Sequence, residues 1–268
     1  MISERIESLV TELPPGRLVR ANEEQSDETP LWLSDEPVAA EAWSGMWERR
    51  AETGLWPLVL DSSPSWGGEF RPWAGGELWP GPVERIAEVD AGGLLAEWWA
   101  DYAAPDEDDD DVRVRQQIVA PFETAQWPGL AAAITSEQDA DAFAHEYGEV
   151  LLSFSGEARL GLVAARSGAE ALVAVGWAGP ANYGSTFKFA AVVASWEERF
   201  GARVVGLTGD TLQLSVAAPP TTIEEALRVA AEHFAFCPDN VWQGKAPCTL
   251  AAYAERLVNA EGWHFWWD

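Results

Sequence analysis

The stretch "ARVVGLTGDTLQLSV", residues 202–216, decides the fold of the C-terminal part of the chain. Apolar and polar residues alternate on both sides of a central Gly-Asp dipeptide, which suits a two-residue turn with glycine first. The pattern predicts a β-hairpin that pairs Leu207 with Leu212 and Val205 with Leu214. All four side chains are expected on one face of a sheet, because side chains alternate along a strand.

Helices are predicted on both sides of this hairpin. The 3.6-residue periodicity over 185–201 predicts one that ends at Gly201. Thr222 and Glu225 form a capping box that begins another, which ends near Cys237. The remaining predicted elements are strands at 159–165 and 263–268 and helices at 167–176 and 249–260.

In chain order these elements give strand, helices, strand, strand, helices and strand, which is the split β-α-β pattern of ferredoxin-like domains. The predicted fold class is therefore α+β, with a ferredoxin-like sandwich packed on an irregular, Trp-rich α+β N-terminal half. A break near Gly156 predicts an acidic N-terminal region at 1–155 and a C-terminal domain at 156–268.

The N-terminal half contains a predicted strand at 55–61 and a helix at 90–102 capped by Asp90. The sharpest shift in composition within this half is "PDEDDDD", residues 105–111. It lacks the glycine and the final glutamate of an EF-hand calcium loop. We expect a solvated, mobile loop, because like charges repel one another.

The charge of the chain is strongly negative, with 44 acidic and 17 basic residues among 268. The segment 1–150 alone holds 32 acids against 9 bases. Such a field repels phosphate backbones, so no nucleic acid partner is expected. A basic protein partner remains open, and so does the simpler explanation that the charge serves solubility.

No stretch approaches the roughly 20 consecutive apolar residues of a membrane helix, and the N-terminus lacks a signal-peptide pattern. We therefore expect no membrane partner and a cytoplasmic location. Two cysteines make no disulfide framework. The oligomeric state is left open.

Sixteen tryptophans are far more than usual. Exposed rings could stack on sugars or anchor a protein partner. We expect most of them to be structural, because large rings bury the most area.

The stretch "AEHFAFCPDN", residues 231–240, brings His233, Cys237 and Asp239 close in sequence. These are candidate catalytic residues of a thiol–imidazole–carboxylate site. Cys237, however, lies on the apolar stripe of its helix, and the dipole at a helix C-terminus opposes a thiolate. We expect a buried structural cysteine, with Glu232 on the opposite side facing solvent.

A zinc site is the second possibility for the same region. His233, Cys237, Cys248 and His264 supply the correct ligand types. Their spacings match no common zinc motif. We predict no metal and no cofactor.

The loop "PDNVWQG", residues 238–244, is polar around one large ring. Its Asp and Asn residues are typical of local turns, which is the favoured interpretation. If the chain has a ligand or partner loop, we expect it to comprise Trp177, Asn182, Asp239, Asn240, Trp242, Gln243 and Asp268.

The C-terminal part resembles a bacterial family catalogued as domain of unknown function 4253. The matching stretches are "GWAGPAN" (176–182), "SWEERFGARVVG" (195–206), "DTLQLSV" (210–216), "EHFAFCPDNVWQG" (232–244) and "FWWD" (265–268). The resemblance supports the predicted boundary and implies no reaction or substrate.

Three functional hypotheses follow. The first is an acidic protein-binding module, regulatory or antitoxin-like, without catalysis. The second is an enzyme that uses Cys237 with His233, or acids such as Asp210 and Asp239. The third is a small-ligand or sugar binder that uses exposed tryptophans.

Overall fold

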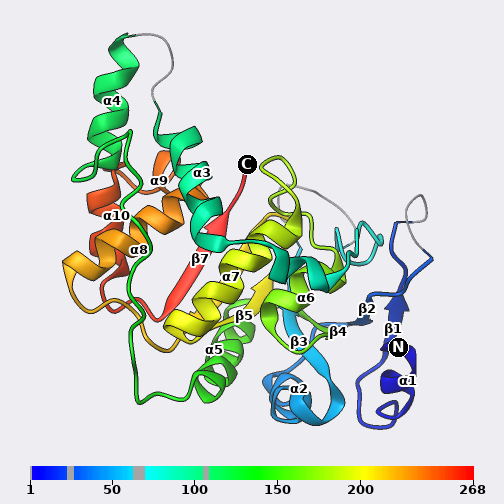
Figure 1. Cartoon of the computed structure of the whole chain (residues 1–268). Helices are drawn as coiled ribbons and strands as arrows, with labels where there is room; N and C mark the ends of the chain where they lie inside the picture. Colours follow the sequence, from blue (N-terminus) through cyan, green and yellow to red (C-terminus); the bar gives the residue numbers. More distant parts are fainter. Residues whose placement is uncertain (1, 23–26, 63–69, 105–108) are drawn as a thin grey trace.

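The computed structural model describes residues 2–22, 27–62, 70–104 and 109–268, and one mixed sheet of seven strands lies at its centre (Figure 1). The order across the sheet is β1-β2-β4-β3-β5-β6-β7, in which β3 and β5 are parallel and the other neighbours antiparallel. The strands are β1 (Gly16–Val19), β2 (Leu31–Ser34), β3 (Leu55–Leu60), β4 (Arg159–Ala164), β5 (Ala202–Leu207), β6 (Thr211–Val216) and β7 (Gly262–Trp266).

Helices cover both faces of this sheet (Figure 1). The helices are α1 (Ile2–Glu7), α2 (Ala40–Thr53), the 3₁₀ helix η2 (Val83–Glu88), α3 (Ala91–Ala103), α4 (Asp109–Val119), α5 (Ala140–Phe154), α6 (Gly168–Val175), α7 (Thr186–Phe200), α8 (Ile223–Phe236), α9 (Asp239–Trp242) and α10 (Leu250–Leu257). Helices α2 and α5 pack on each other and on the sheet, α6 and α7 pack on its other face, and α3 and α8 cover α7.

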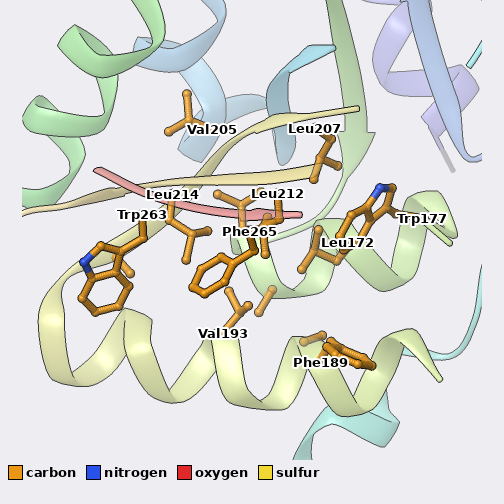
Figure 2. Packing of buried hydrophobic residues seen from close by; sticks show 14 of the residues in the cluster. Leu172, Trp177, Phe189, Val193, Val205, Leu207, Leu212, Leu214, Trp263 and Phe265 are labelled. Carbon is orange, nitrogen blue, oxygen red and sulfur yellow. The ribbon is translucent and has the colours of Figure 1, made fainter. Parts of the chain in front are cut away.

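The hairpin of β5 and β6 forms as predicted near its turn and differs farther out. Leu207 pairs with Leu212, but a β-bulge between Val204 and Gly206 brings Val204 opposite Leu214. The bulge adds one residue to β5 and so reverses its alternation. Figure 2 shows Leu207, Leu212 and Leu214 directed toward α7 and Val205 directed away from it. The predicted pairing of Val205 with Leu214, and the shared face, are wrong.

The prediction of a ferredoxin-like split is also wrong. In a split β-α-β domain one continuous segment supplies the four strands. Here β3 of the N-terminal half lies between β4 and β5, paired with both. All six residues of β3 are buried, because a central strand needs apolar side chains on both faces. The predicted strand at 55–61 is therefore confirmed, but its location at the centre of the sheet was not foreseen.

The predicted boundary near residue 155 stays a prediction. Strands from before and after it share the one sheet. The predicted α+β class and the Trp-rich character are confirmed.

Tryptophan burial supplies much of the core. Eleven of the fifteen tryptophans that the structure describes are buried, so the expectation that most are structural is confirmed. Trp196 of α7 is fully buried and stacks on Phe265 of β7 with ring centroids 5.3 Å apart. Its ring also contacts Trp263 and Phe236 edge-on. These aromatic contacts join α7 and α8 to the strand at the sheet edge.

Short-range signals in the sequence set several helix ends. Thr222 and Glu225 form the predicted capping box of α8. Gly201 ends α7 in the left-handed conformation with φ = 58°. Residues 105–108 of the acidic run lie outside the described residues, and α4 begins at Asp109, so a loop over 109–111 is wrong.

Glu232 does not face solvent, as its position opposite the apolar stripe suggested. Its carboxylate is fully buried and bonds both terminal nitrogens of Arg199, at 2.8 and 2.6 Å. The indole of Trp196 and the backbone N–H of Ala131 donate to it as well, at 2.8 and 2.7 Å. Helix α3 and the segment before α5 cover the face of α8 that carries Glu232. A helical wheel of α8 alone predicts that this polar face is exposed, because it contains no information about the segments that pack on it.

Within the described ranges, no helix has both the length and the apolar character to cross a membrane.

Candidate functional site

In the structure, the thiol and the imidazole that the sequence suggested as a catalytic pair each bond a partner other than each other. Cys237 is fully buried, and its thiol donates to the backbone oxygen of Trp266 at 3.0 Å. His233 is also fully buried, with Nδ1 3.0 Å from the hydroxyl of Tyr253. Burial raises the pKa of the Cys237 thiol and lowers the pKa of His233 well below its usual range. A thiolate–imidazolium pair needs the opposite shifts.

We predict that Cys237 labels at least about tenfold more slowly than Cys248 with iodoacetamide at pH 8, because reaction requires an exposed thiolate. Cys237 is buried, whereas Cys248 is partly exposed. Peptide mapping by mass spectrometry measures both rates, and labelling in denaturant serves as the control in which the rates converge. Equal rates in the native protein would restore the thiol site as a candidate.

Asp239 belongs to a polar cluster that ties α9 to the C-terminal strand. The carboxylate is almost completely buried and accepts from the hydroxyl of Tyr183 at 2.7 Å. Gln243 and the backbone N–H of Asp268 also donate to it, at 3.0 and 3.3 Å. Asn240 donates to the backbone oxygen of His264 at 2.7 Å. These groups bond one another, which fits a structural role.

The other residues of the predicted loop are dispersed. Trp177 is buried and its indole donates to the backbone oxygen of Thr208 at 2.8 Å. Trp242 is partly buried and packs edge-on against Tyr102. Asn182 is exposed. The structure therefore brings together Asp239, Asn240, Gln243 and Asp268, and does not assemble the complete set as one open surface.

The possible zinc ligands are not grouped. Across the described ranges, no three Cys, His, Asp or Glu side chains form a cluster that could hold a metal ion. His264 is exposed on β7, and Cys248 lies partly exposed before α10. Neither joins His233 and Cys237 in a coordination site.

A large concave feature of the described residues is a cleft that the sequence did not indicate. It has a volume of about 930 Å³ and lies between the end of α2, the helix η2, the start of α6 and the outer side of α7. Such a volume is within the range of small-molecule pockets. Its lining joins segments that are far apart in the chain, so we call it the α2–α7 cleft.

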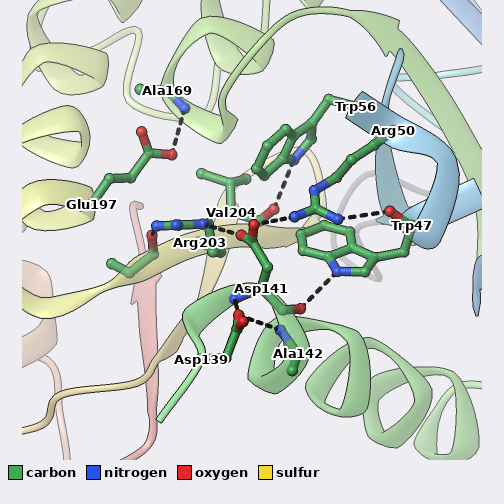
Figure 3. Close-up of polar contacts among 11 residues, drawn as sticks. Trp47, Arg50, Trp56, Asp139, Asp141, Ala142, Ala169, Glu197, Arg203 and Val204 are labelled. Carbon is green, nitrogen blue, oxygen red and sulfur yellow. Dashed lines mark hydrogen bonds and ion pairs between the residues drawn. The ribbon is translucent and has the colours of Figure 1, made fainter. Parts of the chain in front are cut away.

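One wall of the α2–α7 cleft is an ion-pair cluster centred on Asp141 (Figure 3). The Asp141 carboxylate pairs with Arg50 of α2 and with Nε of Arg203 of β5, the latter at 2.7 Å. Arg50 also lies over the ring of Trp47, 4.4 Å from its centroid. Because Asp141 stands in the first turn of α5, the cluster fastens α2 and α5 to the sheet.

Glu197 of α7 lies across the cleft from this cluster (Figure 3). One carboxylate oxygen accepts from the backbone N–H of Ala169 at 3.1 Å, at the start of α6. Burial disfavours the charged form and raises the pKa of Glu197 to about 7. Perturbed carboxyl groups in clefts are frequent at functional sites.

The arginines of the cleft already have carboxylate partners. Arg50 and Arg203 share Asp141, and Arg166 pairs with Glu170 at 2.6 Å. Three further carboxyl groups line the cleft, those of Glu84, Glu197 and Glu198, and none forms an ion pair with a residue that the structure describes. The cleft therefore offers acidic groups to a visiting ligand.

We predict that Glu197→Gln stabilises the protein at pH 8 and has little effect at pH 5. The folded pKa of about 7 exceeds the ordinary 4.5, so the native state loses stability as pH rises between these values. At pH 8 the variant should be about 1–3 kcal/mol more stable, after allowance for partial exposure. Urea unfolding at both pH values measures this, with the exposed neighbour Glu198→Gln as control. A gain that is equal at both pH values would contradict the assignment.

One signal in the sequence could have indicated the cleft. The stretch "SWEERFGARVVG" contains Glu197, Glu198 and Arg203. Their helix and strand were predicted, but their common cleft with Arg50 and Asp141 depends on contacts between distant segments.

Residues 159–268 match the family described as a domain of unknown function, DUF4253. The C-terminal part of the chain is therefore a DUF4253 domain, which confirms the resemblance in the sequence. No curated protein and no solved structure matches the chain. The matched segment contributes Glu197 and Arg203 to the cleft, whereas Arg50 and Asp141 precede it.

Proposed function

We propose that this protein is an acidic binding module whose α2–α7 cleft receives a basic side chain of a protein partner. Through this binding the module would regulate its partner, as an antitoxin does, and it would not catalyse a reaction itself. The partner is expected to be basic because the chain has 44 acids against 17 bases. The same field disfavours nucleic acid.

The observation that carries the proposal is a set of three cleft carboxyl groups that form no direct ion pair among the described residues, although Arg203 and Arg166 act on Glu197 and Glu84 through longer-range electrostatics. Glu84 and Glu198 are exposed, and Glu197 lies deeper. A guanidinium or ammonium group that enters would gain charge-assisted hydrogen bonds. It would also favour the charged form of Glu197, whose pKa burial raises to about 7.

The ion-pair cluster centred on Asp141 also supports this proposal, because it occupies two arginines of the cleft. Arg50 is 16% exposed and Arg203 23% exposed, and both are committed to Asp141. An anionic ligand would compete with Asp141 for these guanidinium groups. A cationic ligand meets no such competition, so the cleft favours cations.

An enzyme is the second candidate, and Glu197 is the observation that favours it. A carboxyl group whose pKa is about 7 can act as a general acid or base near neutral pH. Glu197 thereby replaces Cys237 and His233 as the candidate catalytic residue. A turnover lost in Glu197→Gln would support this candidate.

Peptide binding tests the protein-binding proposal. We predict that a tetra-arginine peptide with blocked ends binds the full chain, and that its uncharged citrulline analogue does not. The double variant Glu197→Gln/Glu198→Gln should weaken binding about tenfold, since two charge-assisted contacts are lost. Calorimetry at low and high salt should show weaker binding as salt rises.

The matched control is Glu146→Gln/Glu157→Gln, which removes two exposed charges outside the cleft. At pH 8, where Glu197 with its pKa of about 7 is mostly charged, both variants remove nearly the same net charge, so the main difference is the position of the charges. Equal weakening in both variants would mean that the peptide binds the overall field, and the cleft would lose its assignment.

A further inference from the structure

A second cavity lies on the other side of η2 and shares no residue with the α2–α7 cleft. Its volume is about 530 Å³, and it lies between the segment before η2, the end of α6 and the start of α7. Trp79, Pro82, Val173 and Phe187 supply apolar wall. We call it the Trp79 cavity.

Trp79 is the most exposed tryptophan that the structure describes, at 37%. Its backbone is held firmly against α6, because Trp79 N–H donates to the oxygen of Gly176 at 2.9 Å. Gly81 N–H donates likewise to Val173 at 3.1 Å. A side chain at Gly176 would begin only 2.1 Å from the carbonyl carbon of Trp79, so glycine is needed for this approach. The exposed ring therefore sits on a fixed backbone.

Arg85 supplies the charge at this cavity. Its guanidinium lies 3.7 Å from the ring centroid of Phe187, and its side chain is 49% exposed. Its ion pair with Glu88 is long, at 3.9 Å. No carboxyl group of the residues that the structure describes lines the cavity, although the chain carries 44 Asp and Glu residues. Among the described lining residues, Arg85 is thus the one that carries a charge, and that charge is positive.

We propose that the Trp79 cavity binds a small aromatic carboxylate, with its ring against Trp79 and its carboxylate on Arg85. An aromatic body matches the exposed indole and the apolar wall. A carboxylate matches the planar guanidinium, which can donate two parallel hydrogen bonds.

A sugar fits this cavity less well. Sugar hydroxyl groups need several polar side chains beside the stacking ring. Among the described lining side chains, polar groups belong to Arg85, Ser185, Thr186 and the indole N–H of Trp79, and the Thr186 hydroxyl already donates to the oxygen of Trp177 at 2.8 Å. The lining therefore favours an aromatic carboxylate over the sugar considered from the sequence.

The test uses 2-naphthoate as probe and 2-naphthamide as its uncharged analogue, with calorimetry on the full chain. Naphthoate should saturate the protein at or below about 1 mM, the range that a ligand of this size reaches in such a cavity. Arg85→Gln should weaken naphthoate about tenfold and leave naphthamide unchanged, because only the charged contact is lost. Trp79→Ala should weaken both probes.

Arg17→Gln is the matched control, since Arg17 is 46% exposed and also pairs with one carboxylate. Because Arg85 is exposed, we expect Arg85→Gln to fold. The comparison of naphthoate with naphthamide in this variant therefore tests the proposal even if Trp79→Ala does not fold. Three results would overturn the proposal: no naphthoate binding at 1 mM, equal weakening by Arg85→Gln and Arg17→Gln, or preference for methyl glucoside over naphthoate. None of these results bears on binding at the α2–α7 cleft, so this proposal can be refuted without refuting the proposed function.

Discussion

Glu232→Ala should lower the free energy of unfolding by about 3–5 kcal/mol, because the change leaves a buried guanidinium without its carboxylate. The Glu232 side chain is fully buried, and the side chain of Arg199 is 14% exposed. Trp196 and Ala131 also lose their acceptor. Chemical denaturation with urea measures the loss.

Glu224→Ala is the matched control, since Glu224 is exposed in the first turn of the same helix. Its loss should stay within about 1 kcal/mol, as for other surface changes. A double variant, Glu232→Leu with Arg199→Met, should lose less than Glu232→Ala, because no charge is then left unpaired. A loss below about 1 kcal/mol for Glu232→Ala would mean that solvent reaches this pair, which the structure excludes.

Deletion of residues 263–268 should prevent folding. It removes most of β7 and the rings of Trp263, Phe265 and Trp267, each no more than 2% exposed. Removal of one buried aromatic side chain costs about 3–5 kcal/mol. Three such losses total about 9–15 kcal/mol, which is comparable to the about 5–15 kcal/mol by which folded domains are stable. Circular dichroism and one-dimensional NMR measure the loss of structure.

Single substitutions refine this prediction within the same strand. Phe265→Ala should cost about 3–5 kcal/mol, because its ring stacks on Trp196 and contacts Phe236. His264→Ala is the control, since His264 points to the opposite, exposed side. A truncated chain with native spectra would show that the C-terminal strand is a dispensable tail.

Local signals in the sequence predicted the local structure. The Thr222–Glu225 box, the glycine that ends α7 and the turn after Leu207 each depend on a few adjacent residues. Such signals act through the hydrogen bonds of one turn, so a single sequence reveals them. The strand at the C-terminus was predicted from alternation in the same manner.

Long-range arrangements could not be predicted in this way. The position of β3 depends on partner residues that are 99 or more positions away in the chain, and nothing in "LWPLVL" indicates which strands those partners belong to. From the sequence, Glu232 is expected at the surface, and only the contacts with Arg199 and Ala131 show that it is buried. The bulge in β5 lies beside Gly206, but a single glycine inside a strand pattern does not tell which residue is shifted. The candidate cleft is also a long-range arrangement, because its carboxyl groups come from α7 and η2, which are far apart in the sequence.

The central position of β3 also constrains the order in which the chain can fold during synthesis. Leu60 pairs with Leu207, so 147 residues must be translated after β3 before its parallel neighbour exists. At about 5–20 residues per second this takes roughly 7–30 s. Throughout that interval the apolar β3 has at least one unpaired edge, because its other neighbour, β4, is completed only at Ala164, and unpaired edges favour aggregation. The nascent protein would therefore depend on chaperone protection until the DUF4253 domain has left the ribosome.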